Sequence, residues 1–364
     1  MKRLTFMLKP ASSMCDMKCG YCFYCDVAAS RRDASLGLMK RETASAIIQN
    51  VYCELAAGDG ITFAFQGGEP GLAGLGFYEF FTDEAAAAAK PGVITNYAFQ
   101  TNGLTVDENW AGFFKERDFL IGLSLDGDAA LHDRNRVDRN GKGTFRRVMN
   151  AKRIMDKFGV RYNALCVLTA ECSRRAGRVW DFIMSENIRH VQFIPCLESL
   201  DGDMHPAACT ADRFYRFYTE LFPLWKTEAD KGNLINIRLF EDIAGVFYSG
   251  RGVTCGISGR CSPQIAVEAD GGVYPCDFYM LDEYKAGNLA LQPLREVFDS
   301  VVSGGFSAGA PRPPARCEGC AYVKWCAGGC KRLANAVYGE RCGMKMFLDE
   351  RLDGLLETVR PYVY

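Results

Sequence analysis

Cysteine is the residue that most constrains how this chain can fold. The 364-residue sequence contains 17 cysteines but only 3 histidines. Eight of the cysteines lie between positions 255 and 342, and three more form a CxxxCxxC motif near the amino terminus: Cys15, Cys19 and Cys22. Sites rich in thiolate and poor in imidazole favour iron–sulfur clusters over catalytic zinc, copper or non-haem iron. We therefore expect metal sites with sulfur ligands to be part of the fold.

The composition and the amino terminus indicate a cytoplasmic protein. The apolar stretch at residues 4–8 is too short for an export signal and is followed at once by Lys9 and Pro10. No apolar run is long enough to cross a bilayer. The formal net charge is −1 and the sequence has no basic cluster, so neither nucleic acid nor an anionic membrane is an expected partner. In a reducing cytoplasm, clustered cysteines serve metal or redox sites rather than disulfides.

The chain before residue 200 alternates between strand-like and helix-like patterns. Six runs rich in apolar or β-branched residues are expected strands: residues 4–8, 62–66, 97–100, 120–125, 161–168 and 190–195. Amphipathic helical patterns lie at residues 40–57, 145–158 and 176–186. Nearly continuous apolar runs are typical of parallel strands buried on both faces. We predict an α/β fold in which a partial (β/α)6 TIM-like barrel occupies residues 1–235, because a complete eight-stranded barrel needs more chain.

The rest of the chain has a different character. A helical pattern at residues 211–231 is followed, from residue 251 to Cys342, by a loop-rich stretch that holds eight cysteines. This stretch has too few periodic apolar residues for a core of its own, so bound metal would have to stabilise it. Eight thiolates suffice for two four-iron clusters or for two zinc sites of ribbon type, and spacing alone leaves both open. We assign residues 236–364 to this second domain, which ends in a helix.

The CxxxCxxC motif directly follows the first expected strand. Its three thiolates would leave one iron of a four-iron cluster without a protein ligand, and that iron could chelate the amino and carboxylate groups of S-adenosylmethionine (SAM). Active sites of barrel folds lie at the carboxyl ends of strands, where this motif is found. The alternative is a structural zinc site, for which Cys25 could supply a fourth ligand.

Small polar residues follow the next three expected strands. Gly67 and Gly68 after the second strand would let the backbone approach a ligand closely, because glycine has no Cβ. Gln100 ends the third strand, Ser124 lies at the end of the fourth, and Arg136 comes shortly afterwards. These groups suit the ribose hydroxyls and the carboxylate of a ligand. Each position alone could be an ordinary turn, but the ordered series favours one ligand site.

Several longer motifs carry a family resemblance. They are residues 8–13 (LKPASS), 63–70 (FAFQGGEP), 100–103 (QTNG) and 274–279 (YPCDFY), together with the cysteine loop. With these motifs the chain resembles, over nearly its whole length, the anaerobic sulfatase-maturating enzymes of the radical SAM superfamily. The resemblance implies SAM contacts at Tyr21, Gly68, Ser124, Arg136 and Leu197, to which we add Gln100.

The resemblance also implies three [4Fe–4S] clusters. Cys15, Cys19 and Cys22 would hold the first, and the later cysteines are similar to those of a SPASM domain. That similarity implies one auxiliary cluster at Cys255, Cys261, Cys276 and Cys330, and another at Cys317, Cys320, Cys326 and Cys342. Spacing alone does not reveal this interleaved assignment. Among the remaining cysteines, Cys53 and Cys166 fall within helix and strand patterns, which predicts small buried residues.

The reaction that the resemblance implies is oxidation of a cysteine or serine side chain to Cα-formylglycine in an unfolded sulfatase polypeptide. A flavodoxin or ferredoxin of low potential would donate electrons. Asp277 would be the general base: it directly follows Cys276, and partial burial near an anionic cluster would raise its pKa. Tyr24 and Gln66 are expected to help place the substrate.

Two other functions compete with this hypothesis. Another SPASM-type radical SAM peptide maturase, which forms thioether or carbon–carbon cross-links, would share every cluster ligand. Such enzymes often carry a separate leader-binding domain, and we expect none before residue 4, which favours sulfatase maturation. A non-catalytic binding protein stabilised by zinc is more distant, since it leaves the ordered strand-end motifs unexplained.

Overall fold

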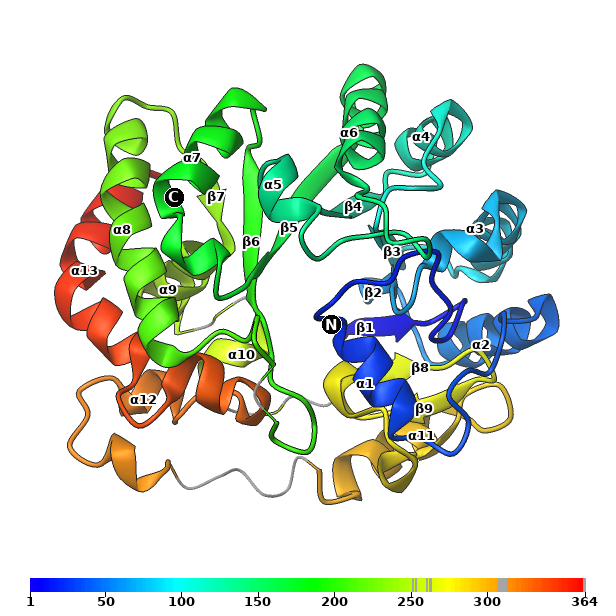
Figure 1. Cartoon of the computed structure of the whole chain (residues 1–364). Helices are drawn as coiled ribbons and strands as arrows, with labels where there is room; N and C mark the ends of the chain where they lie inside the picture. Colours follow the sequence, from blue (N-terminus) through cyan, green and yellow to red (C-terminus); the bar gives the residue numbers. More distant parts are fainter. Residues whose placement is uncertain are drawn as a thin grey trace. The chain divides into compact units, whose positions relative to one another are not determined.

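The chain forms two compact units, each built from three segments (Figure 1). The computed structural model describes residues 1–203, 205–250, 252, 254–259, 261, 264–306 and 313–362. The first unit comprises Met1–Ser124, Arg136–Tyr162 and Pro263–Gly309. The second comprises Leu125–Asn135, Asn163–Ser262 and Ala310–Tyr364. Within the described ranges, every helix is too short or too polar to serve as a membrane span.

A parallel sheet forms the centre of the first unit. Its strands β1 (Arg3–Leu8), β2 (Gly60–Phe65), β3 (Ile94–Thr101) and β4 (Leu120–Ser124) are neighbours in that order. The sequence predicted all four, although β3 starts earlier than expected, at Ile94. Leu8 pairs with Phe65, so β1 and β2 end at the same edge. The cysteine loop and the glycine pair therefore begin side by side.

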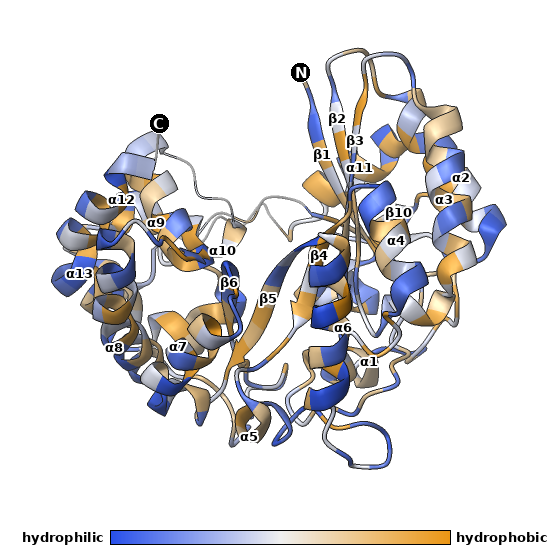
Figure 2. Cartoon of the chain, turned by 90° about the horizontal axis from the view of Figure 1, so that it is seen from above, coloured by the Kyte–Doolittle hydropathy of each residue, from blue (hydrophilic) through white to orange (hydrophobic). Residues whose placement is uncertain are grey.

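Amphipathic helices accompany this sheet. They are α1 (Phe23–Ala29), α2 (Arg41–Cys53), α3 (Leu75–Ala88), α4 (Glu108–Glu116), α6 (Phe145–Phe158) and α11 (Leu294–Ser303). Figure 2 shows hydrophilic and hydrophobic stripes on α6, where Val148, Ala151 and Met155 are buried. These positions recur at the helical period, as its sequence pattern predicted. Gly159 ends the helix in the left-handed conformation that glycine adopts easily.

Aromatic side chains on β2 and α3 form the core of the first unit. Phe65 contacts Tyr78 and Phe81 edge-on, with ring centroids 5.0 Å apart in each pair. All three rings are almost completely buried. Truncation of such a phenylalanine to alanine costs about 3–5 kcal/mol. This core fixes β2, whose carboxyl end leads into the glycine pair.

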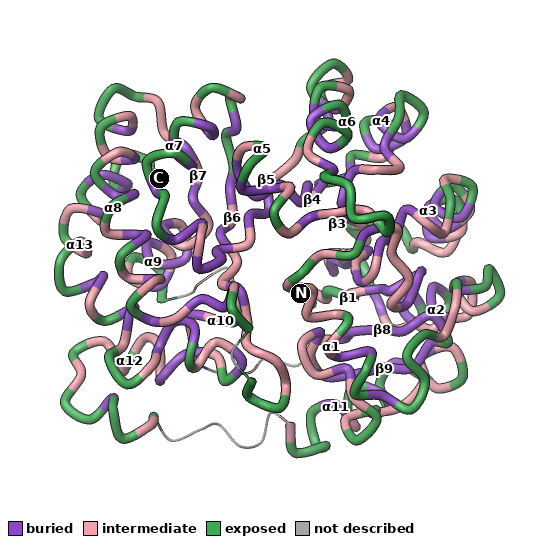
Figure 3. The backbone as a smooth tube through the Cα atoms, in the orientation of Figure 1, coloured by how far each residue is buried: buried purple, intermediate pink, exposed green. Residues whose placement is uncertain are grey.

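Three short strands from late in the sequence extend the sheet beyond β1. β8 (Ile265–Val267) pairs in parallel with β1, β9 (Gly272–Tyr274) pairs antiparallel with β8, and β10 (Gly287–Asn288) pairs with β9. Every residue of β8 is buried (Figure 3). The sequence did not predict these strands, because runs of two or three residues show no measurable alternation. Residues 264–306 therefore belong to the first unit and bury apolar side chains in its core.

The second unit contains most of β5 (Arg161–Leu168) with β6 (His190–Pro195) and β7 (Asn236–Ile237), all parallel and in that order. Its helices are α5 (Ala129–His132), α7 (Ala176–Ser185), α8 (Ala211–Asp230), α9 (Arg238–Ser249), α10 (Cys255–Ser258), α12 (Val323–Cys326) and α13 (Gly343–Val359). Phe240 of α9 stacks on Phe347 of α13 at 5.8 Å and meets Trp225 of α8 at 4.8 Å. The predicted strands and the predicted helix at 211–231 are confirmed. The division expected at residue 235 stays a prediction.

Candidate active site

The first cysteine loop lies at the carboxyl end of β1 and is held in place by residues that follow β4. The backbone of Lys18 donates a hydrogen bond to the carbonyl of Val137 at 2.8 Å. Arg139 donates two more, from Nε and Nη2, to the carbonyl of Cys15 at 2.9 and 2.7 Å. Cys22 is the N-cap residue of α1. The loop is therefore a fixed turn with three half-buried thiols.

Three thiols in one short loop fit the ligand chemistry of an iron–sulfur cluster. Among the described residues, no three side chains of Cys, His, Asp or Glu converge closely enough to hold one ion. Tetrahedral zinc, with Zn–S bonds of about 2.3 Å, needs its sulfurs roughly 3.8 Å apart. In a four-iron cluster each thiolate binds a different iron, so the sulfurs lie farther apart. The sulfur of Cys15 also accepts hydrogen bonds from the Met17 backbone at 3.3 Å and the Asn102 amide at 3.7 Å, as cluster sulfurs commonly do.

The glycine pair after β2 is required by the packing of the chain itself. Both residues have positive φ, +84° at Gly67 and +55° at Gly68. A Cβ at Gly68 would lie 2.2 Å from the carbonyl oxygen of Met14, and a Cβ at Gly67 would lie 2.2 Å from Cε of Lys9. Packing against Met14 and Lys9 thus already explains both glycines, whereas the sequence had suggested close approach of a ligand. A SAM contact at Gly68 stays a prediction.

Glu69 is a buried residue that the sequence reasoning missed. Its carboxylate accepts hydrogen bonds from the backbone of Gly71 at 2.9 Å, the hydroxyl of Thr101 at 2.8 Å and the backbone of Asn102 at 2.7 Å. Burial raises the pKa of Glu69 to about 7, while these donors lower it. The side chain of Asn102 in turn donates to Asp16 at 2.7 Å. Glu69 therefore connects the ends of β2 and β3 to the cysteine loop. In the sequence, the only indication of this role was an acidic residue inside the QGGEP motif.

The residues expected to contact SAM are placed as follows. The guanidinium of Arg136 lies over the ring of Tyr21, 5.5 Å from its centroid, and is almost fully buried. Ser124 is buried at the last position of β4. Gln100 is half-buried near the end of β3. Leu197 belongs to the second unit, just after β6. The structure brings Tyr21 and Arg136 together, and all of these ligand contacts stay predictions.

Tyr24 and Asp277 meet although 253 positions separate them in the sequence. The hydroxyl of Tyr24 donates to Oδ2 of Asp277 at 2.8 Å. Asp277 is 8% exposed, and its other oxygen, Oδ1, has no hydrogen-bond partner among the described atoms. Burial raises the pKa of Asp277, whereas Lys9 and the Tyr24 hydroxyl lower it. The pairing of β9 with β8, and of β8 with β1, carries Asp277 to this place.

Aromatic packing and one amide complete the surroundings of this pair. The ring of Phe23 packs at a tilt against that of Tyr24, with centroids 4.0 Å apart, and against that of Phe278 at 5.0 Å. Gln66, half-buried after β2, donates from its amide to the sulfur of Met7 at 3.2 Å. The aromatic rings restrict the rotamers of Tyr24. Contacts of Tyr24 and Gln66 with a substrate stay predictions.

Three of the later cysteines, Cys255, Cys261 and Cys330, lie in the second unit. Burial, and next the charges of Cys330 and Cys261, raise the pKa of the Cys255 thiol. The backbone of Cys330 donates to the carbonyl of Gly256 at 3.1 Å, which explains how it reaches back to α10. Cys276, the fourth member of this set, lies in the first unit after β9.

The other four gather separately, also within the second unit. Burial, and then the charges of Cys342, Cys317 and Cys320, raise the pKa of the Cys326 thiol. The sulfur of Cys342 also accepts the backbone N–H of Lys345 at 3.4 Å at the start of α13. The cysteines that act on Cys255 and on Cys326 therefore belong in each case to the same expected set. The assignment of both sets to clusters stays a prediction.

Of the cysteines outside these sets, Cys25 is exposed and its thiol is hydrogen-bonded to that of Cys22, and four others are buried. Cys166 and Cys172 are buried with their sulfurs 4.0 Å apart, and Cys196 and Cys209 are buried as well. Burial raises the pKa of the Cys196 thiol to about 12 and raises that of the Cys209 thiol as well, so both are poor nucleophiles near neutral pH. The prediction that Cys53 is buried is wrong: this residue is exposed, because it lies at the end of α2.

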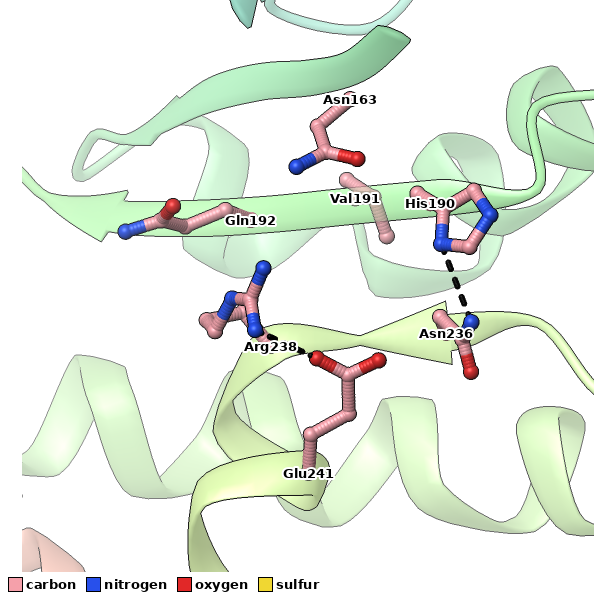
Figure 4. A pocket seen from close by; sticks show the side chains of 7 residues that line it. All are labelled: Asn163, His190, Val191, Gln192, Asn236, Arg238 and Glu241. Atoms are coloured by element: carbon pink, nitrogen blue, oxygen red, sulfur yellow. Dashed lines mark hydrogen bonds and ion pairs between the residues drawn. The ribbon is translucent and has the colours of Figure 1, made fainter. Parts of the chain in front are cut away.

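A small polar pocket lies in the second unit at the opposite ends of the strands (Figure 4). Its lining residues are Asn163, His190, Val191, Gln192, Asn236, Arg238 and Glu241. His190 and Asn236 are the first residues of β6 and β7, and Nδ1 of His190 is hydrogen-bonded to Nδ2 of Asn236 at 3.0 Å. Nη1 of Arg238 forms an ion pair with Oε2 of Glu241 at 2.8 Å. Active sites of βα folds lie at the carboxyl ends of strands, so this pocket has no part in the candidate site.

Comparison with known proteins identifies a family. A profile of the iron-sulfur cluster-binding domain SPASM matches residues 255–321. The chain is 37% identical over 334 residues to a cysteine-type anaerobic sulfatase-maturating enzyme of Clostridium novyi, covering 91% of this chain and 89% of that one. It is 30% identical over 361 residues to a serine-type enzyme of Klebsiella aerogenes, covering 98% and 86%.

The solved structures agree with this result. The structure described as native anSMEcpe with bound AdoMet matches with a TM-score of 0.92 at 33% identity, covering 98% of this chain and 99% of that one. The peptide-bound structure of Streptococcus suis SuiB, at 18% identity and a TM-score of 0.62, shares the fold alone. The chain therefore belongs to the family of anaerobic sulfatase-maturating enzymes.

Proposed function

We propose that this enzyme oxidises a cysteine or serine side chain in an unfolded sulfatase polypeptide to Cα-formylglycine. The observation that carries this proposal is the 2.8 Å hydrogen bond between Tyr24 and Asp277. It joins the residue two positions after Cys22 to the residue directly after Cys276, so a buried carboxylate lies near two proposed cluster loops. A base at such a place can take the proton of a substrate thiol or hydroxyl while an electron leaves through a cluster.

The enzyme uses [4Fe–4S] clusters and S-adenosylmethionine. When bound, these groups supply an electron, the radical that removes a hydrogen atom from the substrate Cβ, and an acceptor for the electron left behind. Cys15, Cys19 and Cys22 are the proposed ligands of the first of three clusters. The two auxiliary sets are Cys255, Cys261, Cys276 and Cys330, and Cys317, Cys320, Cys326 and Cys342. The proposed SAM contacts are Tyr21, Gly68, Gln100, Ser124, Arg136 and Leu197.

Asp277 is the proposed general base. Its Oδ2 is held by the Tyr24 hydroxyl, and its Oδ1 is left to accept the proton of the substrate thiol or hydroxyl. Loss of this proton, of one hydrogen atom from Cβ and of one electron converts a cysteine to a thioaldehyde. Water then replaces its sulfur, which leaves as hydrogen sulfide, and a serine yields the aldehyde directly. Tyr24 and Gln66 are proposed to help place the substrate segment.

Cysteine is the proposed target residue. The cysteine-type relatives share 35–37% identity with this chain, against 26–30% for the serine-type relatives. One solved relative, matching at a TM-score of 0.91, holds AdoMet and a peptide named Cp18Cys. We therefore expect a peptide with cysteine at the target position to be the better substrate.

The remaining assignments follow from the proposed chemistry. A flavodoxin or ferredoxin of low potential would supply the electrons. The cytoplasm, being reducing, suits a chain whose 17 cysteines are clustered for metal or redox sites. Residues 1–235 are assigned to the radical SAM barrel and residues 236–364 to the SPASM domain, which contains the matched residues 255–321.

Anaerobic turnover of sulfatase peptides tests the proposal. Matched peptides with cysteine, serine or alanine at the target position are incubated with reconstituted enzyme, SAM and a low-potential reductant, then analysed by mass spectrometry with and without an aldehyde-reactive hydrazide. We expect an aldehyde that forms a hydrazone from the cysteine peptide, less from the serine peptide and none from the alanine control.

Other outcomes would identify the competing functions. Loss of two hydrogens from the cysteine peptide without a hydrazide-reactive aldehyde indicates a cross-linking maturase. Absence of iron and acid-labile sulfide in protein prepared without air would leave the zinc-stabilised binding protein. Either result rejects formylglycine formation by this chain.

A further inference from the structure

Three charged side chains are buried together in the first unit, next to the proposed base but outside the expected site. Glu268 is 0% exposed and Lys9 is 2% exposed. Oε1 of Glu268 lies 3.4 Å from Nζ of Lys9 and 2.6 Å from Nη1 of Arg31. Burial of unpaired charge costs several kcal/mol per ion, so each of these groups depends on its partners. In the sequence Lys9 ended an apolar stretch and lay in the LKPASS motif, and its burial in the structure gives it a further role to explain.

The position of Lys9 links this triad to Tyr24. Its ammonium lies over the ring face of Tyr24, 4.7 Å from the centroid, within the range of a cation–π contact. Its stem passes over Gly67, where any Cβ would come within 2.2 Å of Lys9 Cε. The chain thus keeps a glycine with positive φ at the place where this stem needs room.

The guanidinium of Arg31 packs against a different aromatic ring. It lies 5.6 Å from the ring of Tyr274, not over Tyr24. The two cations therefore share Glu268 but support different aromatic rings. Substitution of either cation disturbs the triad, but only substitution of Lys9 removes the contact with Tyr24. Comparison of the two variants therefore distinguishes these effects.

We propose that Lys9 is a positioning residue, whose buried ammonium holds the ring of Tyr24 so that its hydroxyl keeps Asp277 aligned with the substrate. The inference rests on the proposed function, in which Asp277 takes the substrate proton. The contacts of the Lys9 ammonium are Glu268 and the Tyr24 ring, and its charge also lowers the pKa of Asp277. Misalignment of a base by about 1 Å costs up to a hundredfold in rate. Loss of Lys9 should therefore uncouple radical formation from product formation.

Lys9→Met is the informative variant, because it leaves Glu268 paired with Arg31. Arg31→Met is the matched control, since it removes an equal charge from the same triad and leaves Glu268 paired with Lys9. Lys9→Gln is a second neutral variant that can still donate to Glu268. Each protein is reconstituted anaerobically, and its iron content, melting temperature, formylglycine formed per 5′-deoxyadenosine, and peptide kcat and KM are measured.

We expect Lys9→Met and Lys9→Gln to keep their iron and to lower formylglycine per 5′-deoxyadenosine about tenfold, with the loss in kcat and not in the peptide KM. Arg31→Met should melt earlier but keep the wild-type ratio. A crystal structure of Lys9→Met should show Tyr24 in a new rotamer or without its bond to Asp277, a readout independent of turnover.

A wild-type ratio in folded Lys9→Met or Lys9→Gln overturns the proposal. So does an equal loss of the ratio in Arg31→Met, which would make the triad a stabilising element only. If the wild-type enzyme cleaves SAM but forms no formylglycine, the proposed function fails instead. In that case the crystal structure alone decides whether Lys9 positions Tyr24.

Discussion

The most consequential single residue is Asp277. It is buried, one oxygen is held by Tyr24, and the other oxygen has no partner among the described atoms. A buried carboxylate with one unsatisfied oxygen lowers the free energy of unfolding. Such a cost is typical of a functional group and not of a turn residue, which would lie in solvent.

Asp277→Asn should separate base catalysis from the rest of the reaction. An asparagine can still accept the Tyr24 hydrogen bond but cannot take a proton, so formylglycine formation should fall about 10²–10⁴-fold. Iron content and SAM cleavage should persist, because no proposed ligand is changed. Asp270→Asn is the control, since Asp270 is an exposed residue of the same unit that pairs with Lys285. Full product formation by Asp277→Asn would reject the base assignment.

At the scale of elements, the carboxyl ends of β2 and β3 form one polar scaffold for the cysteine loop. Glu69 ties the two strand ends together, and Asn102 continues the connection to Asp16. The sequence predicted β2 and β3 because their apolar runs are local patterns. It did not predict β8 to β10, since such short strands are stable only through the neighbours with which they pair.

Glu69→Gln should weaken this scaffold. Whichever way the new amide turns, its NH2 group must face the backbone N–H of either Gly71 or Asn102, which loses its acceptor. We expect a loss of about 1–3 kcal/mol in unfolding free energy. The melting temperature should be compared at pH 8, above the pKa of Glu69, which burial raises to about 7. Glu79→Gln, on the exposed face of α3, should change little, and equal stability of both variants would contradict the scaffold role.

At the scale of the whole molecule, the two units differ in what stabilises their loop-rich parts. Residues 264–306 pair with β1 and bury apolar side chains in the first unit. Residues 313–342 of the second unit contain only helices of three to five residues, α12 the only α-helix among them, and five of the proposed cluster ligands. Where hydrophobic burial is scarce, bound metal contributes to folding.

Removal of iron should therefore loosen residues 313–342 before the rest of the chain. Arg316, Lys324 and Arg341 are candidate trypsin sites there. Under anaerobic conditions, we expect cleavage at these sites to be about tenfold faster in the iron-free protein, because local opening becomes easier by roughly 1.4 kcal/mol. Cleavage within α8 serves as the internal control. Equal protection with and without iron would show that metal does not stabilise this segment.

The sequence by itself determined the features that are encoded locally. The six main strands, helix α6 and the CxxxCxxC loop follow from patterns within a few neighbouring residues, because hydrophobic period and thiol spacing are local properties. The tertiary structure alone decided which distant groups meet. Tyr24 joins Asp277, and Lys9 joins Glu268, only because β8 pairs with β1, and no local pattern encodes a contact across more than 250 residues. The buried charges became visible for the same reason, since burial is a property of the folded chain and not of the residue.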